Sequence, residues 1–227
     1  MLKDNLAILK TIKDGQKRPD GIFGSFMTRP ISHIFAFIAL KLRLTPNGVS
    51  IASFLFSILA IFPIAIDFFP AKNRIIAVTL WWFGAILDSS DGDLARYLKT
   101  GNPFGAWLDS FLDRIKEIAI FSTLGWLAYK NNGDIYLLLT IMAISANLLS
   151  GYISDTKKMF LSGVRKPEIA FSKKYSFGMV DTRDFFVILA IILAQPEAII
   201  WLYATVFNIA VLFQFAVFYK KFGIKRQ

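Results

Sequence analysis

Long apolar runs separated by short polar breaks constrain this chain more than any other feature of its sequence. Of its 227 residues, 55% are hydrophobic and 19% are charged, whereas about a quarter of an ordinary soluble domain is charged. A helix of about 20 apolar residues crosses a bilayer core about 30 Å thick. We therefore predict an all-α fold, a bundle of six transmembrane helices, with spans near 47–69, 75–98, 103–129, 134–156, 178–195 and 197–219.

The first 43 residues depart from this pattern. Residues 1–22 are polar, and they lack the apolar run and cleavage site of a signal peptide. Residues 23–43 mix large apolar and charged side chains, which is typical of a helix lying on a membrane surface, and Pro30 is expected to bend or start it. The predicted division is a polar tail with an N-terminal amphipathic interfacial helix over 1–43, and the six-helix transmembrane domain over 44–227.

Lysine and arginine are distributed unevenly over the polar breaks. Eight lie in residues 1–46, seven in 157–183 and four in 220–227, whereas the alternate breaks carry two, one and none. Because basic loops stay on the cytoplasmic side, six spans with both termini cytoplasmic satisfy every loop. The net charge of +10 is then expected to face anionic lipid, which indicates an integral protein of the cell membrane without a nucleic-acid partner.

Two scarce residue types narrow the possible chemistry. The chain has no cysteine and a single histidine, His33. The lack of cysteine excludes disulfides, thiolate nucleophiles and cysteine-ligated metals, and one histidine leaves little room for a histidine-rich site. A metal ion held by side chains of this protein must therefore rest on oxygen ligands.

Acidic residues are concentrated in one part of the chain. Six of the 16 fall between positions 88 and 117, at the predicted cytoplasmic ends of two spans: Asp88, Asp91, Asp93, Asp109, Asp113 and Glu117. A carboxylate at membrane depth is costly unless it lines a wet cavity, pairs with a cation or binds one. The cluster is therefore the leading candidate for a functional site.

Helical geometry arranges four of these acids in two stripes. At about 100° per residue, Asp88 and Asp91 share one helix face, and Asp109 and Asp113 share another. The short connection over 99–102 makes the two helices antiparallel neighbours, so the stripes can face each other. Hard divalent cations prefer such oxygen ligands, and a site with four aspartates has room for two ions.

The residues around the acids complete a recognisable pattern. Residues 88–113 read Asp-x-x-Asp-Gly-x-x-Ala-Arg, then eight residues, then Gly-x-x-x-Asp-x-x-x-Asp. This resembles the signature of the CDP-alcohol phosphatidyltransferase family. The predicted spans and the segment Thr45-Pro46-Asn47 are also similar to that family, so the resemblance covers most of the chain.

The resemblance implies a metal-dependent transferase. Asp88, Asp91 and Asp109 would bind two divalent ions, Mg²⁺ or Mn²⁺. Asp113 would be a further metal ligand and the catalytic general base that accepts the proton of the attacking hydroxyl. A clamped diphosphate, an attacking hydroxyl and a carboxylate base are also the parts that a transfer at phosphorus needs.

The resemblance also implies the substrates and their contacts. Gly92 and Arg96 would contact the CDP part of a CDP-linked donor, with Asn47 and Asn102 near the nucleotide. The acceptor would be a small polar alcohol or its phosphate, CMP would leave, and the product would be a phospholipid. Members of the family are expected to form homodimers.

The acceptor site has a less specific signal. In relatives that use phosphorylated acceptors, basic residues at the ends of the last spans hold the acceptor phosphate. Lys157, after the fourth span, and Arg183, inside the fifth, are the corresponding predictions here. The surrounding basic loop also fits a plain role in membrane orientation.

Two donors remain open. The predicted interfacial helix favours a lipid donor, CDP-diacylglycerol or its archaeal ether equivalent, because that helix could brace the acyl chains. The segment over 20–47 resembles a branch of the family that uses soluble CDP-inositol and an inositol phosphate.

Two other classes of protein use acidic residues in membranes. Membrane prenyltransferases carry two aspartate-rich motifs on distant spans, which does not match one continuous motif. A cation transporter would place its acids near the midplane of repeated halves, and the sequence shows no repeat. Both fit the sequence less well.

Overall fold

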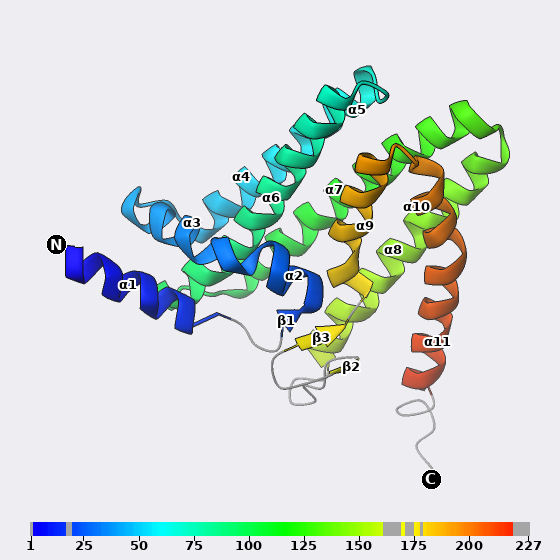
Figure 1. Ribbon diagram of the computed structural model, residues 1–227. Helices are drawn as coiled ribbons and strands as arrows, with labels where there is room; N and C mark the ends of the chain where they lie inside the picture. The colour runs from blue at the N-terminus through cyan, green and yellow to red at the C-terminus, as the bar shows by residue number, and fades with distance from the viewer. Residues whose placement is uncertain (1, 17–19, 161–168, 171–174, 178, 220–227) are drawn as a thin grey trace, which may run out of the picture. The chain divides into compact units, whose positions relative to one another are not determined.

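The structure is a computed structural model that describes residues 2–16, 20–160, 169–170, 175–177 and 179–219. The described chain is almost entirely helical (Figure 1). Its helices are α1 (Leu2–Asp14), α2 (Ile22–Met27), α3 (Arg29–Lys41), α4 (Pro46–Leu59), α5 (Ile61–Ile66), α6 (Ala71–Leu98), α7 (Pro103–Asn132), α8 (Ile135–Phe160), α9 (Met179–Leu193), α10 (Pro196–Leu202), the π-helical η1 (Tyr203–Phe207) and α11 (Asn208–Phe218).

The chain divides into two compact units. The first unit comprises Met1–Lys116 and Val164–Ala194, and the second comprises Glu117–Gly163 and Gln195–Gln227. Helix α7 crosses this division, so its first half, with Asp109 and Asp113, belongs to the first unit together with α6.

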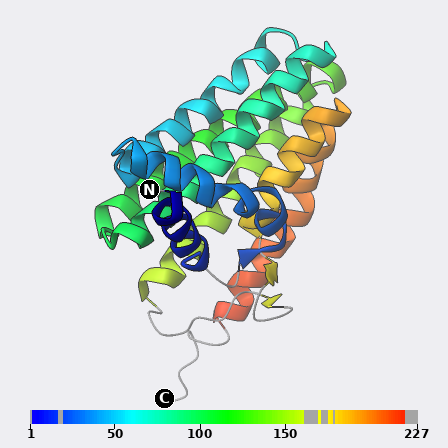
Figure 2. The same ribbon diagram turned by 60° about the vertical axis from the view of Figure 1, so that its left-hand side comes forward.

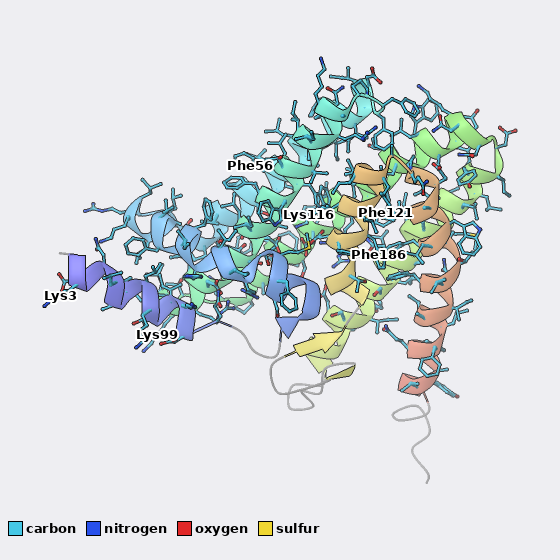
Figure 3. The ribbon with its side chains drawn as sticks, viewed as in Figure 1. Lys3, Phe56, Lys99, Lys116, Phe121 and Phe186 are labelled. Atoms are coloured by element: carbon cyan, nitrogen blue, oxygen red, sulfur yellow. The ribbon has the colours of Figure 1, made fainter. Side chains whose placement is uncertain are left out.

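Helices α4 and α6 lie side by side in the first unit, as both ribbon views show (Figures 1 and 2). The Ser53 hydroxyl donates to the carbonyl of Gly84 at 2.9 Å, and a Cβ at Gly84 would come within 3.1 Å of the Ser53 carbonyl. The labelled Phe56 of α4 meets Phe83 of α6 edge to face, with ring centroids 4.7 Å apart (Figure 3). Small and hydroxyl side chains therefore permit a close helix contact, which membrane helices commonly use.

The N-terminal segment contains more helix than the sequence predicts. Residues of the expected polar tail form α1, whose buried Ile12 packs against Ala36, Ala39 and Leu94. Figure 2 shows α1, in dark blue, beside α3. Four-residue spacing of Ile8 and Ile12 gives this lysine-rich helix its apolar stripe.

The predicted interfacial helix over 23–43 is divided in two. Helices α2 and α3 meet at Thr28, and Pro30 lies in the first turn of α3. Proline is favoured there because the first turn of a helix needs no N–H partner. The placement of this segment on a membrane surface remains a prediction.

A small three-stranded sheet joins three short segments of the first unit. Strand β1 (Asp20–Gly21) runs parallel to β3 (Tyr175–Phe177), which pairs antiparallel with β2 (Ile169–Ala170). The predicted all-α fold therefore agrees with the helices but does not include this sheet. Strands of two or three residues are too short to produce an alternating pattern in the sequence.

The second unit packs α8 against the continuous α10, η1 and α11. The rings of Phe121 and Tyr203 lie 4.7 Å apart, and Tyr203 stacks on Phe207 at 3.9 Å. The Asn208 amide donates to the carbonyl of Met142 at 3.0 Å. A buried polar pair also joins α7 to α8, because the Asn147 amide donates to Glu117 Oε2 at 2.8 Å.

Helices coincide with all of the predicted spans, but they are not equally apolar. Within the described residues, three are long and apolar enough to cross a membrane: Pro46–Ile66, Ile135–Thr156 and Pro196–Val217. Helices α6 and α7 are longer still, with 28 and 30 residues, and they carry the acidic cluster. The count of six spans and the cytoplasmic location of the termini remain predictions.

Candidate active site

The turn between α6 and α7 brings the two acidic stripes together. Helix α6 ends at Leu98, and the following Lys99 caps it with a left-handed φ of 55° and an N–H that donates to the carbonyls of Ala95 and Arg96. The Asn102 side chain then caps α7 by accepting from the Gly105 N–H at 2.8 Å. The chain reverses within a few residues, as the short connection predicts.

One cavity of about 300 Å³ lies in the first unit between α6, α7, α9 and the junction of α2 with α3. All four predicted metal ligands line it, together with Gly92, Arg96 and Arg183. Its polar lining consists of Thr28, Arg29, Asp88, Ser89, Asp91, Arg96, Asp109, Asp113, Arg183 and Asp184.

Lys116 joins two of the predicted metal ligands. Its ammonium lies 2.8 Å from Asp88 Oδ1 on α6 and 2.6 Å from Asp113 Oδ1 on α7. Only 4% of Lys116 is exposed, and Figure 3 shows the labelled side chain in the interior. The motif does not include this residue, although a lysine one turn after Asp113 inside a predicted membrane span is itself a costly and informative feature.

Asp91 has a different neighbour. It accepts a short hydrogen bond from the Ser50 hydroxyl of α4 and is 7% exposed. In the described part of the chain, no three acidic or histidine side chains gather closely enough to hold one ion. The four predicted ligands line one cavity, but two of them, Asp88 and Asp113, form ion pairs with Lys116.

Asp93 faces away from these ligands, toward α3. Its Oδ1 lies 3.0 Å from Arg29 Nη1 and 2.5 Å from Arg96 Nη2. Its Oδ2 accepts from the Ser32 hydroxyl at 2.7 Å and from the Gln16 amide at 3.3 Å. Arg96, predicted to contact CDP, is thus held by a buried carboxylate.

Asn47 and Asn102, the two asparagines predicted near the nucleotide, lie beside Gly105. A Cβ at Gly105 would stand 3.0 Å from Asn47 Oδ1 and 3.5 Å from Asn102 Oδ1. Neither asparagine is among the residues that line the cavity. Their nucleotide contact stays a prediction, and the observed role of Asn102 is to cap α7.

Of the two residues predicted to bind the acceptor, Arg183 lies at the cavity. Arg183 of α9 is 3% exposed, lines the cavity, and places its Nε 3.2 Å from Asp184 Oδ1. The side chain of Lys157 lies outside the described residues. Arg183 therefore adds a third arginine to a cavity that also contains five aspartates.

The comparisons with known proteins identify the family. The profile of the CDP-alcohol phosphatidyltransferase family matches residues 43–216, which is most of the chain. The chain belongs to this family of transferases.

Several curated relatives are similar to part or most of the chain. The bifunctional IPC transferase and DIPP synthase of Aquifex aeolicus is 28% identical over 208 residues, which are 90% of this chain and 45% of that protein. The archaetidylinositol phosphate synthase of Pyrococcus horikoshii is 36% identical over 92 residues, covering 40% of this chain and 46% of that protein. The matches thus span about half the length of these relatives.

Solved structures share the fold. A crystal structure of the phosphatidylinositol phosphate synthase of Mycobacterium tuberculosis with CDP-DAG bound has a TM-score of 0.65 and 23% identity, and the match covers 87% of this chain and 98% of that one. A second structure of that protein, with manganese and citrate, has a TM-score of 0.59 and 23% identity. The match covers 80% of this chain and 86% of that one.

Proposed function

We propose that this protein is an integral membrane enzyme that transfers a substituted phosphate group from a CDP-linked donor to the hydroxyl of a small polar alcohol or its phosphate. The observation that carries the proposal is that the four motif aspartates line one cavity with Gly92 and Arg96. In the reaction, the acceptor oxygen attacks phosphorus, the bond from phosphorus to the CMP oxygen breaks, and CMP leaves. The product is a phospholipid or a related phosphodiester.

The donor set fits a hard divalent cation. Asp88, Asp91, Asp109 and Asp113 offer only carboxylate oxygens, the ligands that Mg²⁺ and Mn²⁺ prefer. Bound there, such ions would supply positive charge to the donor diphosphate and to the leaving phosphate oxygen. We propose two sites, with Lys116 giving up Asp88 or Asp113 when both are filled. Manganese in a crystal structure of a family member supports this reading.

Asp113 is the proposed general base. Its carboxylate lies in the cavity beside the ammonium of Lys116, on the helix opposite Asp88. A carboxylate in this position can accept the proton of the acceptor hydroxyl as its oxygen attacks. Gly92 and Arg96 are proposed to contact the CDP diphosphate, since glycine admits close approach and a guanidinium pairs well with phosphate.

A lipid donor is the first candidate. Three helices apolar enough to span a bilayer, and the family member solved with CDP-DAG, support it. Soluble CDP-inositol with an inositol phosphate acceptor is the second candidate, because the Aquifex relative whose name includes DIPP synthase matches 90% of this chain. In either case we propose that Arg183, and Lys157 beyond the described side chains, hold the acceptor phosphate. Cytoplasmic termini, a cytoplasmic active site and a homodimer complete the proposal.

The test is release of CMP by the purified protein in detergent with Mg²⁺ or Mn²⁺. CDP-diacylglycerol, CDP-archaeol and CDP-inositol are supplied separately, each with a pool of small alcohols and sugar phosphates. We expect release from one donor that depends on the metal and falls at least about 1,000-fold in Asp113→Asn, since the base and a metal ligand are lost together.

Asp134→Asn is the matched control, because Asp134 is an exposed aspartate just before α8, in the second unit. It should retain wild-type release. Absence of CMP release from all three donors would contradict the proposed function.

A further inference from the structure

Asp93 holds two arginines from different parts of the first unit. A single oxygen, Oδ1, lies 3.0 Å from Arg29 Nη1 at the start of α3 and 2.5 Å from Arg96 Nη2 on α6. The Asp93 side chain is completely buried. Two guanidinium groups from different elements therefore meet at one carboxylate oxygen.

Both arginines also line the cavity. Their side chains are 17% and 37% exposed, and both belong to the cavity lining, as do Ser89 and Gly92. A Cβ at Gly92 would lie 3.2 Å from Arg96 Nη1, so glycine leaves space beside this guanidinium. The two guanidinium groups therefore border the same space as the proposed metal-binding carboxylates.

Arg29 is held in place by its surroundings. Its Nη1 also donates to the carbonyl of Ser89 at 3.3 Å. The preceding Thr28 hydroxyl lies 2.9 Å from Ser89 Oγ, and Trp82 Nε1 donates to the carbonyl of Met27 at 2.9 Å. Three consecutive residues at the α2–α3 junction thus form hydrogen bonds with α6. Because these bonds already restrict Arg29, it loses less conformational entropy when it binds a ligand.

We propose that Arg29, paired with Arg96 on Asp93, forms a subsite for a phosphoryl oxyanion of the substrate. The proposal rests on the proposed function and extends it, because Arg29 lies outside the motif over 88–113. Arginine suits the task because its planar fork can donate two parallel hydrogen bonds to phosphate oxygens. Asp93 is a positioning residue that keeps both guanidinium groups at the cavity wall.

The phosphoryl oxyanion could belong to the CDP-linked donor or to a phosphorylated acceptor, and the KM values of the two substrates distinguish these cases. If the bound group belongs to the CDP-linked donor, Arg29→Gln raises the KM for the donor about 10–100-fold and leaves the KM for the acceptor unchanged. If it belongs to a phosphorylated acceptor, the acceptor KM rises instead. Arg29→Lys should recover part of the loss, because it restores the charge without the fork.

Arg43→Gln is the matched control, since Arg43 is exposed and is not part of the cavity lining. Both KM values should equal those of the wild-type protein. If Arg29→Gln keeps both wild-type KM values and its thermal midpoint, the subsite proposal is wrong.

A binding experiment separates this failure from failure of the proposed function. Inorganic pyrophosphate is titrated into the full-length protein in detergent with EDTA, so that no metal mediates the contact. We expect the wild-type and Arg43→Gln proteins to bind it about 10–100-fold more tightly than Arg29→Gln. Equal binding by all three would overturn the subsite even if CMP release is observed, and the expected difference would support it even if no donor is turned over.

Discussion

Two buried aspartates on opposite sides of α6, Asp91 and Asp93, have different partners. Asp91 faces the cavity and accepts a hydrogen bond from the uncharged Ser50 hydroxyl. Asp93, two residues later, faces α3 and is held by Arg29 and Arg96. Both aspartates are buried, at 7% and 1% exposure.

The difference shows which carboxylate is available to a ligand. Asp93 is paired with Arg29 and Arg96, so its carboxylate needs no metal ion and instead positions the two guanidinium groups. Burying a carboxylate without a cation is expensive. On the cavity side, Asp91 is buried with the Ser50 hydroxyl as a partner, and Asp88 and Asp113 share the ammonium of Lys116. That side is therefore the one expected to recruit metal ions.

Asp91→Asn should have the largest effect on catalysis. The amide can still accept from Ser50, but it loses the charge that a divalent ion requires. We expect kcat/KM for CMP release to fall at least about 1,000-fold, with an unchanged or higher thermal midpoint. Full activity in this variant would remove Asp91 from the metal site.

Asp93→Asn should act chiefly on stability. It removes the negative charge that Arg29 and Arg96 share, which we expect to lower the free energy of unfolding by about 3 kcal/mol. Thermal unfolding in detergent measures the loss. A midpoint equal to that of the wild-type protein would show that the arginines do not depend on Asp93.

Lys116→Met should strengthen metal binding. Removing the ammonium frees Asp88 and Asp113, and we expect affinity for Mn²⁺ to rise about tenfold, or about 1.4 kcal/mol. Without metal the variant should unfold at a lower temperature, and Mn²⁺ should restore its midpoint.

Lys72→Met, which changes an exposed lysine near the start of α6, is the matched control and should bind Mn²⁺ like the wild-type protein. Weaker Mn²⁺ binding by Lys116→Met would mean that the ammonium organises the ligands rather than competing for them.

Two serines provide the finest test. Ser50→Ala removes the hydroxyl that bonds Asp91, and Ser32→Ala removes the one that donates to Asp93 at 2.7 Å. Each should cost about 1 kcal/mol. We expect the first to appear as a roughly fivefold loss in kcat/KM and the second as a lower unfolding midpoint. The reverse assignment would contradict the distinction between the two sides of α6.

The sequence predicts that the motif aspartates lie close together, because local helical geometry determines their positions. Spacing along α6 and α7 is enough to place Asp88, Asp91, Asp109 and Asp113, and all four line one cavity. The short turn that makes the helices antiparallel is visible in the residues over 99–102.

Contacts between distant segments could not be read in the same way. Arg29 and Asp93 are 64 residues apart, and no periodicity links α3 to one face of α6. Lys116 was overlooked for another reason: its position one turn after Asp113 predicts a local ion pair, but its reach to Asp88 requires the packed helices.

Mn²⁺ binding to the purified protein, measured by titration calorimetry for the wild type, Asp91→Asn and Asp93→Asn, shows directly which side of α6 holds the metal. The comparison is made below the unfolding midpoint of each variant, with Ser32→Ala as a milder change on the α3 side. We predict that the wild-type, Asp93→Asn and Ser32→Ala proteins bind Mn²⁺ with similar affinity and that Asp91→Asn binds at least about tenfold more weakly. Wild-type affinity in Asp91→Asn together with lost binding in folded Asp93→Asn would contradict it.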